Sequence, residues 1–302
     1  HQEQETLRKY SGWGGLGTYF NNEHSEENKL LRSVLDDDEY ETSVTSINSA
    51  YFTPAKIIDA LWDIAQKLGF KGGNILEGSA GIGNIIGSMP ISISDKSNIH
   101  AIEIDNISGG ILKLLYPDAK VDIQGFEDTK VPNGSVDLAI TNVPFVTGLN
   151  VLDKTDSDLS TKFKNIHDFC IAKNIRKLRE GGIGIFITTS NTMDKSDNLR
   201  KWIVDKGNTD FIGAFRLNNK TFEGAPVTSD IIIVRKRIGN DISENAIDAL
   251  TTIPFRKASY ETKELDHVRG KGFTKVTKEL VMILNNYFAK HPGNMAGKMK
   301  FG

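Results

Sequence analysis

One short stretch of this chain places an amide, a proline and an aromatic ring directly after an apolar run. The run covers residues 136–140 and predicts a buried strand that ends in a turn. Asn142 offers a side-chain carbonyl acceptor, and Pro144 fixes the direction of the backbone carbonyls beside it. Phe145 adds a flat apolar face on which a planar ring can stack. These residue types suit chemistry on an amino group attached to a planar ring.

The expected chemistry is activation of that amino group as a nucleophile. The Asn142 side chain and the backbone carbonyl of Val143 would each accept one of its hydrogen bonds. Two such bonds draw the nitrogen lone pair out of conjugation and direct it at an electrophile, so fixed dipoles stabilise the transition state. In the purely structural alternative, the same residues only end a strand in a proline turn with a packed Phe.

Alternating strands and helices must position this stretch. Apolar runs predict strands at residues 74–77, 99–103, 120–124, 136–141, 184–188, 211–215 and 231–235. Periodic apolar residues predict helices at 57–68, 107–115, 163–178 and 199–206. Thr53 is the expected N-cap of the first helix, and Pro54 suits its first turn. The alternation predicts an α/β fold with a mostly parallel sheet of seven strands and helices on both faces.

In such a sheet, ligands bind beyond the carboxyl ends of the strands, and the ends that precede Asn142 carry suitable groups. The first strand runs into a turn in which Gly78, Gly81 and Gly83 allow a ligand to approach the backbone. The second strand ends at Glu103, a carboxylate that can accept hydrogen bonds from a ribose diol.

The third strand end completes this set. Asp128 is placed to bind an adenine amino group, while Phe126 packs on the adenine ring. The separation of about twenty residues between Gly83 and Glu103 also fits the spacing of a nucleotide-binding glycine turn and its acidic residue. Suitable groups at successive strand ends therefore predict an adenosine-containing cofactor beside Asn142.

At this point the chain resembles a known family. Residues 139–145 resemble the N-P-P-F/Y signature of S-adenosylmethionine-dependent amino-methyltransferases, chiefly the DNA adenine-N6 class, with Val143 in place of the first Pro. Residues 75–84 resemble the family's L-E-P-S-A-G-x-G motif, with Gly78 in place of the Pro. Residues 51–54 resemble its Y-F-T-P segment, which lies against the methionine end of the cofactor. The resemblance implies a Rossmann-like class I methyltransferase fold with S-adenosylmethionine as cofactor.

The resemblance also implies roles for individual residues. The catalytic residues are expected to be Asn142, Val143, Pro144 and Phe145. The expected cofactor-binding residues are Phe52, Thr53, Pro54, Glu77, Gly78, Ser79, Ala80, Gly81, Gly83, Asn84, Glu103, Ile104, Phe126 and Asp128. No metal site is expected. Because the residue before a proline is biased toward an extended backbone, a Pro at position 143 is expected to be tolerated.

Flanking segments resemble one lineage of such proteins. Residues 10–16, 216–222, 227–236 and 291–299 are similar to pieces of large phage and conjugative-element proteins in which an adenine-methylase-like domain precedes a helicase-like domain. The implied partners are DNA and a fused or separate helicase and specificity component. The first residue is His1 rather than Met, which predicts a piece of a longer protein.

Three parts of the chain are expected. An N-terminal arm over residues 1–50 carries a Trp/Gly-rich loop, and Trp13 is expected to pin it to the domain. The methyltransferase domain is expected over residues 51–238, and a C-terminal helical extension over 239–302 with a closing helix at 278–290.

Composition limits the partners. The 302 residues are 38% hydrophobic and 25% charged, which fits a globular protein with a sizeable core. Its 37 Lys and Arg against 39 Asp and Glu give a net charge of −2, so DNA binding by this chain alone is expected to be weak. The lone Cys170, with no signal peptide or long apolar span in the sequence, predicts a cytoplasmic protein without a membrane partner.

Two polar segments border the expected site. Residues 146–165 predict a long polar loop beside the catalytic turn. Residues 256–278 carry mixed charges, and an ordinary solvated surface is favoured slightly over a phosphate-binding face.

Three functions remain open. The first is transfer of a methyl group from S-adenosylmethionine to adenine N6 in DNA. The second is a catalytically inactive methyltransferase-like module that binds DNA or a partner, which the Val143 variant motivates. The third is methylation of glutamine side chains in proteins, which uses a similar turn.

Overall fold

A seven-stranded sheet forms the centre of the computed structural model, which describes residues 2–14, 16–47, 51–145, 152–222, 227–265 and 273–299. The strand order is β3-β2-β1-β4-β5-β7-β6. The strands are β1 (Gly73–Glu77), β2 (Ser97–Glu103), β3 (Lys120–Ile123), β4 (Val136–Asn142), β5 (Leu178–Thr189), β6 (Thr209–Arg216) and β7 (Ser229–Lys236). Strand β7 runs antiparallel to both of its neighbours, β5 and β6, and the other pairings in this sheet are parallel. The predicted α/β fold with a mostly parallel seven-stranded sheet is confirmed.

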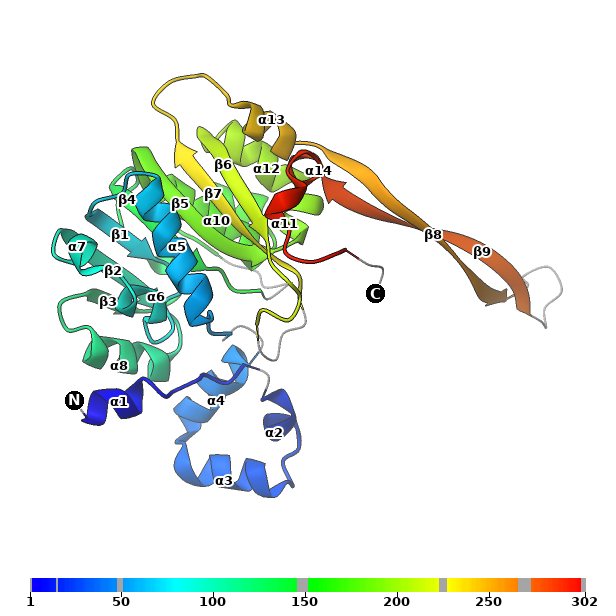
Figure 1. Ribbon diagram of the computed structural model, residues 1–302. Helices are drawn as coiled ribbons and strands as arrows, with labels where there is room; N and C mark the ends of the chain where they lie inside the picture. The colour runs from blue at the N-terminus through cyan, green and yellow to red at the C-terminus, as the bar shows by residue number, and fades with distance from the viewer. Residues whose placement is uncertain are drawn as a thin grey trace.

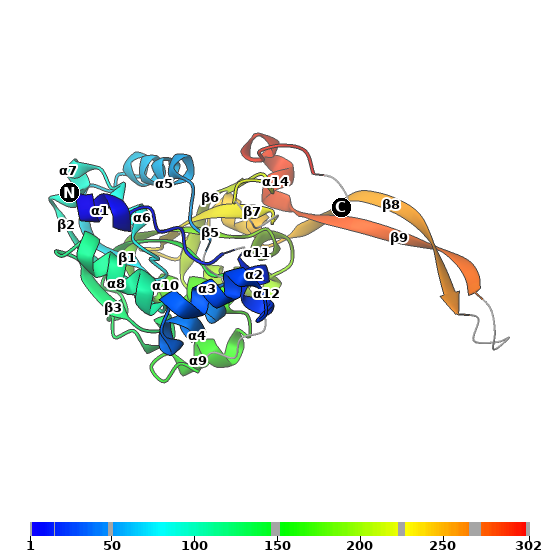
Figure 2. The same ribbon diagram turned by 90° about the horizontal axis from the view of Figure 1, so that it is seen from below.

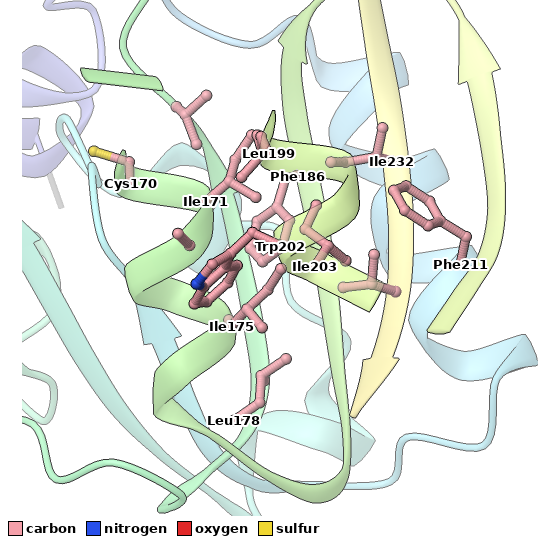
Figure 3. Close-up of a cluster of buried hydrophobic side chains, with 14 of the residues drawn as sticks. Cys170, Ile171, Ile175, Leu178, Phe186, Leu199, Trp202, Ile203, Phe211 and Ile232 are labelled. Atoms are coloured by element: carbon pink, nitrogen blue, oxygen red, sulfur yellow. The ribbon is translucent and has the colours of Figure 1, made fainter. Parts of the chain in front are cut away.

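Helices cover both faces of the sheet (Figure 1). Alternate residues of β5 belong to different hydrophobic clusters, because successive side chains of a strand point to opposite faces. One cluster contains the buried residues of α5 (Ala55–Lys67). The other contains those of α10 (Ile166–Lys177) and α12 (Asp197–Val204), and Figure 3 shows Ile175, Trp202 and Ile203 gathered beside Phe186. A fourth helix, α8 (Asn106–Leu115), contacts β2 and β3.

The register of the parallel strands aligns the predicted site. Glu77 is paired with Ala101 two residues before the end of β2, and Glu103 is paired with Ile123 at the end of β3. Leu76 is paired with Ala139, three residues before Asn142. The carboxyl ends of β1 to β4 therefore share one edge of the sheet, as the sequence predicts.

The N-terminal segment forms small helices with a core of their own. They are α1 (Gln2–Leu7), α2 (Gly17–Asn21), α3 (Glu26–Val34) and α4 (Asp37–Ser46). Trp13 packs here, with its ring centroid 5.5 Å from that of Phe20, rather than pinning the arm to the domain as expected. This segment reaches the domain through α1 and α4, which contact helix α8 (Asn106–Leu115), and through Tyr10, whose ring centroid lies 6.3 Å from that of Phe52.

The C-terminal segment corrects a second expectation. Residues 278–285 belong to strand β9 (Phe273–Asn285), which pairs with β8 (Thr252–Leu265) in a long hairpin that projects from the body (Figures 1 and 2). The helix α14 begins only at Asn286 and ends at Lys290. Leu280, Ile283 and Leu284 fit a helical stripe, but each pairs across the hairpin with a residue of β8, and that long-range pairing overrides the local pattern.

Short elements complete the described chain. They are α6 (Asn84–Gly87), α7 (Ile91–Ser94), η1 (Phe126–Asp128), α9 (Ser157–Lys162), α11 (Asn191–Asp194), α13 (Glu244–Ala249) and η2 (Pro292–Asn294). None of the helices in the described ranges has the length and apolar character needed to cross a membrane.

Candidate functional site

The glycine turn after β1 is tight and needs its glycines. Gly81 and Gly83 have φ angles of 56° and 82°, a region that residues with a Cβ rarely adopt. A Cβ on Gly81 would lie 2.9 Å from the ring of Phe52, and one on Gly83 would lie 2.5 Å from Leu112. The backbone N–H of Gly81 donates a hydrogen bond of 2.6 Å to Glu103. The turn after β1 and the acidic end of β2 are therefore one unit.

Glu103 anchors this unit and keeps capacity for a ligand. Its second carboxylate oxygen accepts a hydrogen bond of 2.8 Å from the backbone N–H of Asp105. Each carboxylate oxygen has a further lone pair with which it can accept a hydroxyl donor. Burial raises the pKa of Glu103, although the backbone hydrogen bonds oppose that rise.

Glu77 lies beside Glu103, and its buried carboxylate has fewer hydrogen-bond partners than that of Glu103. Its side chain is 1% exposed, and its Oε2 atom has no hydrogen-bond partner in the described ranges. Burial, and then the charge of Glu103, raises the pKa of Glu77 well above its usual value. Within the described residues, no Lys, Arg or His forms an ion pair with either carboxylate. The pair is therefore suited to a ligand that brings hydroxyl donors and positive charge.

The expected adenine-binding residues take up different positions. Phe126 is buried with its ring edge against Gly78, where an added Cβ would lie 3.1 Å from the ring. Asp128 is exposed at the end of η1, and Ile104 is 66% exposed directly after Glu103. The apolar side chain of Ile104 and the carboxylate of Asp128 are therefore open to a ligand. Phe126 instead packs against Gly78 of the glycine turn.

The remaining cofactor-binding candidates lie on the same edge. Ser79 and Asn84 are half-buried, and Ala80 is buried with its N–H donating to the Ile102 carbonyl. The N-cap expectation is wrong for Thr53: helix α5 begins at Ala55, Pro54 occupies the capping position, and no side chain caps the helix. Pro54 has an extended backbone, so the helix begins only after it.

Asn142 is held in a defined orientation at the end of β4. Its amide nitrogen donates a hydrogen bond of 3.2 Å to the backbone carbonyl of Tyr51. Its carbonyl oxygen, Oδ1, is buried and has no partner among the residues that the structure describes. A buried acceptor without a donor costs free energy, and a ligand amino group would satisfy it. Tyr51 directly precedes Phe52, so this segment connects Asn142 with the glycine turn.

Val143 lies one residue beyond the end of β4 and still bonds to β5, which weighs against the prediction that a Pro would be tolerated there. Its side chain is 2% exposed, and its N–H donates a hydrogen bond of 3.0 Å to the Ile187 carbonyl of β5. Pro has no N–H and would lose that bond. Phe145 is half-buried, and its ring meets Phe222 edge-on at a centroid distance of 5.9 Å.

The polar segment after the turn at Asn142–Phe145 is only partly the loop expected over 146–165. Residues 146–151 lie outside the described residues. Beyond them, Asp153 and Asp156 are buried and bind basic residues of α10. Lys173 bonds the carboxylate of Asp153 and donates a hydrogen bond of 2.8 Å to the carbonyl of Glu127. This ionic network fixes residues 153–156 against α10 and η1.

Sequence reasoning missed three residues that shape this edge: Asp105, Tyr10 and Lys173. Asp105 is the N-cap of α8 and is 3% exposed, and its side chain accepts hydrogen bonds from the N–H and hydroxyl of Ser108. The pattern Asp105-x-x-Ser108 before an apolar helix is a capping signal that could have been found. Tyr10 and Lys173 contact partners distant in sequence, so no local signal pointed to them.

Comparisons with known proteins agree with this fold. No protein-family model matches the chain. Defense against restriction protein B of Escherichia phage P1 is 31% identical over 197 residues, which are 62% of this chain. The match spans only 8% of that protein's length.

Two solved structures share the architecture. The methyltransferase subunit of a type I restriction-modification system from Streptococcus thermophilus aligns with a TM-score of 0.55 at 13% identity, over 72% of this chain and 53% of that one. A Listeria monocytogenes protein assigned to the class I S-adenosylmethionine-dependent methyltransferases aligns with a TM-score of 0.54 at 16% identity, over 76% and 81%. This chain has the Rossmann-like fold of the class I S-adenosylmethionine-dependent methyltransferases.

Proposed function

We propose that this chain transfers a methyl group from S-adenosylmethionine to adenine N6 in DNA, as one domain of a larger methylase-helicase protein. One observation carries the proposal. The amide nitrogen of Asn142 is tied to the Tyr51 carbonyl, while its carbonyl oxygen is buried and unpartnered within the described chain. An acceptor fixed in this way, beside an edge suited to an adenosyl cation, fits the activation of an amino group.

The residues of the edge fit the cofactor. S-adenosylmethionine would supply an electrophilic methyl group on a cationic sulfur. Glu103 would accept hydrogen bonds from the ribose. A cationic ligand would stabilise the ionised form of Glu77, which burial and Glu103 disfavour in the ligand-free protein. Ile104 would pack on the adenine ring and Asp128 would bind its amino group.

On the target side, Asn142 Oδ1 and the Val143 carbonyl would each accept a hydrogen bond from the amino group of the substrate. Phe145 would stack on the target base, with its own ring positioned by Phe222. The amino group of a stacked base cannot reach such a site, so the base must leave the helix or belong to a single strand.

Methyl transfer from tritiated S-adenosylmethionine to adenine-containing DNA tests the proposal. Asn142→Ala should lower the rate about a hundred- to a thousandfold, as loss of one preorganised hydrogen-bonding partner typically does. Cofactor affinity should stay close to that of the wild type, because the amide acts on the target base. Asn240→Ala, at an exposed position after β7, is the matched control and should behave as the wild type.

The same assay separates the alternatives. Undiminished transfer by Asn142→Ala would remove the turn from the mechanism. Cofactor binding without transfer to any substrate would favour the inactive module. Transfer to protein glutamine rather than DNA would change the substrate class.

The larger protein and its DNA recognition are part of the same proposal. Defense against restriction protein B is far longer than its match to this chain, and the Streptococcus thermophilus neighbour belongs to a multi-subunit restriction-modification system. With a net charge of −2, this chain alone should bind duplex DNA weakly and with a shallow salt dependence. Fluorescence anisotropy across a salt series measures both the affinity and its salt dependence. Tight sequence-specific binding by residues 1–302 would contradict the proposal that another domain or partner recognises the DNA sequence.

A further inference from the structure

The segment after α1 lies on the edge proposed to hold the cofactor. Helix α1 contacts α8, the helix that follows Glu103 and Asp105, and Figures 1 and 2 both show α1 beside α8. From there the chain runs through Tyr10 toward α2 to α4. Gly12, with a φ of 72°, gives the segment a turn that a residue with a Cβ would resist.

Tyr10 is the residue of this segment that reaches the edge. Its ring lies 6.3 Å from that of Phe52, and Phe52 packs directly on Gly81 of the glycine turn. On its other side, Tyr10 lies 6.1 Å from Trp13 in an edge-to-face arrangement. Tyr10 thus joins the N-terminal helices to the glycine turn through a series of aromatic contacts.

The hydroxyl of Tyr10 is buried and unsatisfied. Within the described part of the chain it forms no hydrogen bond of standard geometry, although the side chains of Ser108 and Trp13 lie near it and lower its pKa. Burial, and then the carboxylate of Asp105 and that of Glu103, raises the pKa of Tyr10, so the hydroxyl keeps its proton at neutral pH. A protonated hydroxyl can both donate and accept, which matches the hydroxyls of a ribose.

We infer that Tyr10 is a cofactor-binding residue whose hydroxyl bonds the ribose of the adenosyl group, opposite Glu103. The inference rests on the proposed function and extends it, because it makes the N-terminal arm part of the cofactor site. It also gives a reason for the aromatic contacts between this arm and the glycine turn.

Calorimetric titration with S-adenosylhomocysteine tests the contact without requiring catalysis. Tyr10→Phe removes only the hydroxyl and should weaken binding about three- to tenfold, the scale of one net hydrogen bond. Tyr10→Ala also removes the ring beside Phe52 and should weaken binding further. Tyr260→Phe is the matched control, because that ring is 50% exposed on the hairpin. Thermal unfolding without ligand verifies that each variant is folded.

Adenosine serves as a second ligand that lacks the amino-acid part. Tyr10→Phe should weaken adenosine and S-adenosylhomocysteine binding by the same factor if the hydroxyl bonds the ribose. A loss with S-adenosylhomocysteine alone would overturn the ribose assignment.

Limited trypsin digestion gives an independent readout. Arg8 and Lys9 are exposed and directly precede Tyr10, whereas Lys257 is exposed on β8. S-adenosylhomocysteine should slow cleavage after Arg8 and Lys9 and leave cleavage after Lys257 unchanged. In Tyr10→Ala this protection should be lost.

The two proposals can fail separately. If the wild-type chain does not bind S-adenosylhomocysteine at all, the proposed function fails. If the wild type binds and Glu103→Ala weakens binding, yet Tyr10→Phe matches the wild type and the arm is not protected, the cofactor edge stands and the role of Tyr10 is wrong.

Discussion

At the edge proposed to bind the cofactor, Glu77 and Glu103 have no paired cation among the described residues. On α10, by contrast, buried lysines pair with buried carboxylates. Lys173 bonds Asp153, and Lys177 lies 3.0 Å from Asp156. Both regions remove carboxylates from water, which disfavours the ionised form unless another charge or hydrogen bond compensates. In the α10 network the compensation comes from the chain itself. At the edge it is left for a ligand to supply, which is why an uncompensated buried charge marks the candidate site.

The opposite pKa shifts express the same difference. Burial alone would raise the pKa of Asp153. The hydrogen bonds from Lys173, the Asp156 backbone and Thr155 outweigh burial and lower that pKa. For Asp156, Lys177 and Arg176 likewise outweigh burial and lower the pKa. Glu77 has burial and a second carboxylate acting in the same direction, so its pKa rises.

The largest expected effect comes from breaking the paired region. Lys173→Met keeps most of the side-chain volume but leaves Asp153, which is 3% exposed, buried without its cation. Removing one partner of a buried ion pair typically costs about 3–5 kcal/mol, and we expect a loss of unfolding free energy on that scale in urea denaturation.

The exposed pair of Lys201 with Asp197 on α12 is the matched control, with side chains 64% and 49% exposed. Lys201→Met should cost less than about 1 kcal/mol, as surface pairs usually do. Combining Lys173→Met with Asp153→Leu should recover most of the loss, because the uncompensated charge is gone. An equal loss in the single and double variants would show that volume, not charge, matters there.

At the unpaired edge, a substitution should act in the opposite direction. Glu77→Gln replaces the buried carboxylate by a neutral group of the same shape. At pH 8 it should stabilise the ligand-free protein by about 1–3 kcal/mol, because a carboxylate without a partner costs more to bury in its ionised form than a neutral amide does. The same variant should bind S-adenosylmethionine less tightly, because the favourable negative charge is lost. Urea denaturation and calorimetry measure the two effects. A ligand-free Gln variant less stable than the wild type would mean that Glu77 is already compensated.

The smallest expected effect is the pH dependence of stability. Its sign differs between the edge with Glu77 and the ionic network on α10. The raised pKa of Glu77 means that the folded protein holds this proton more tightly than the unfolded chain. Its contribution is fully present below the usual value of 4.5 and is lost as the pH rises through the raised folded pKa. Asp153 and Asp156 contribute above their usual value of 3.8, and that contribution is lost as the pH falls through the lowered pKa.

Urea denaturation over a pH series checks these signs. Glu77→Gln should remove part of the decline in stability above pH 4.5, whereas Lys173→Met should reduce the decline below pH 3.8. If the pH curves of Glu77→Gln and the wild type were parallel, the pKa of Glu77 would be the same in the folded and unfolded states, and the assigned shift would be wrong.

Much of the fold and part of the candidate site could be predicted from the sequence. Each of the seven strands of the main sheet shows its own apolar run, and the motifs follow directly after strands, so local patterns were sufficient. Parallel strands then bring their carboxyl ends to one edge, which is why Gly81, Glu103 and Asn142 could be assigned to one site before any contact was known.

Only the tertiary structure decided the rest. The hairpin β8–β9 replaces a predicted helix because strand pairing with a distant segment outweighs a local apolar stripe. Lys173 meets Asp153 from twenty residues away, and three helices, α2 to α4, separate Tyr10 from Phe52 along the chain. Whether the Asn142 oxygen is free, and whether Glu77 has a partner, depends on what every other segment places beside them. Periodicity reports which face of an element is buried, but compensation of a buried polar group depends on three-dimensional neighbours that the order of residues does not reveal.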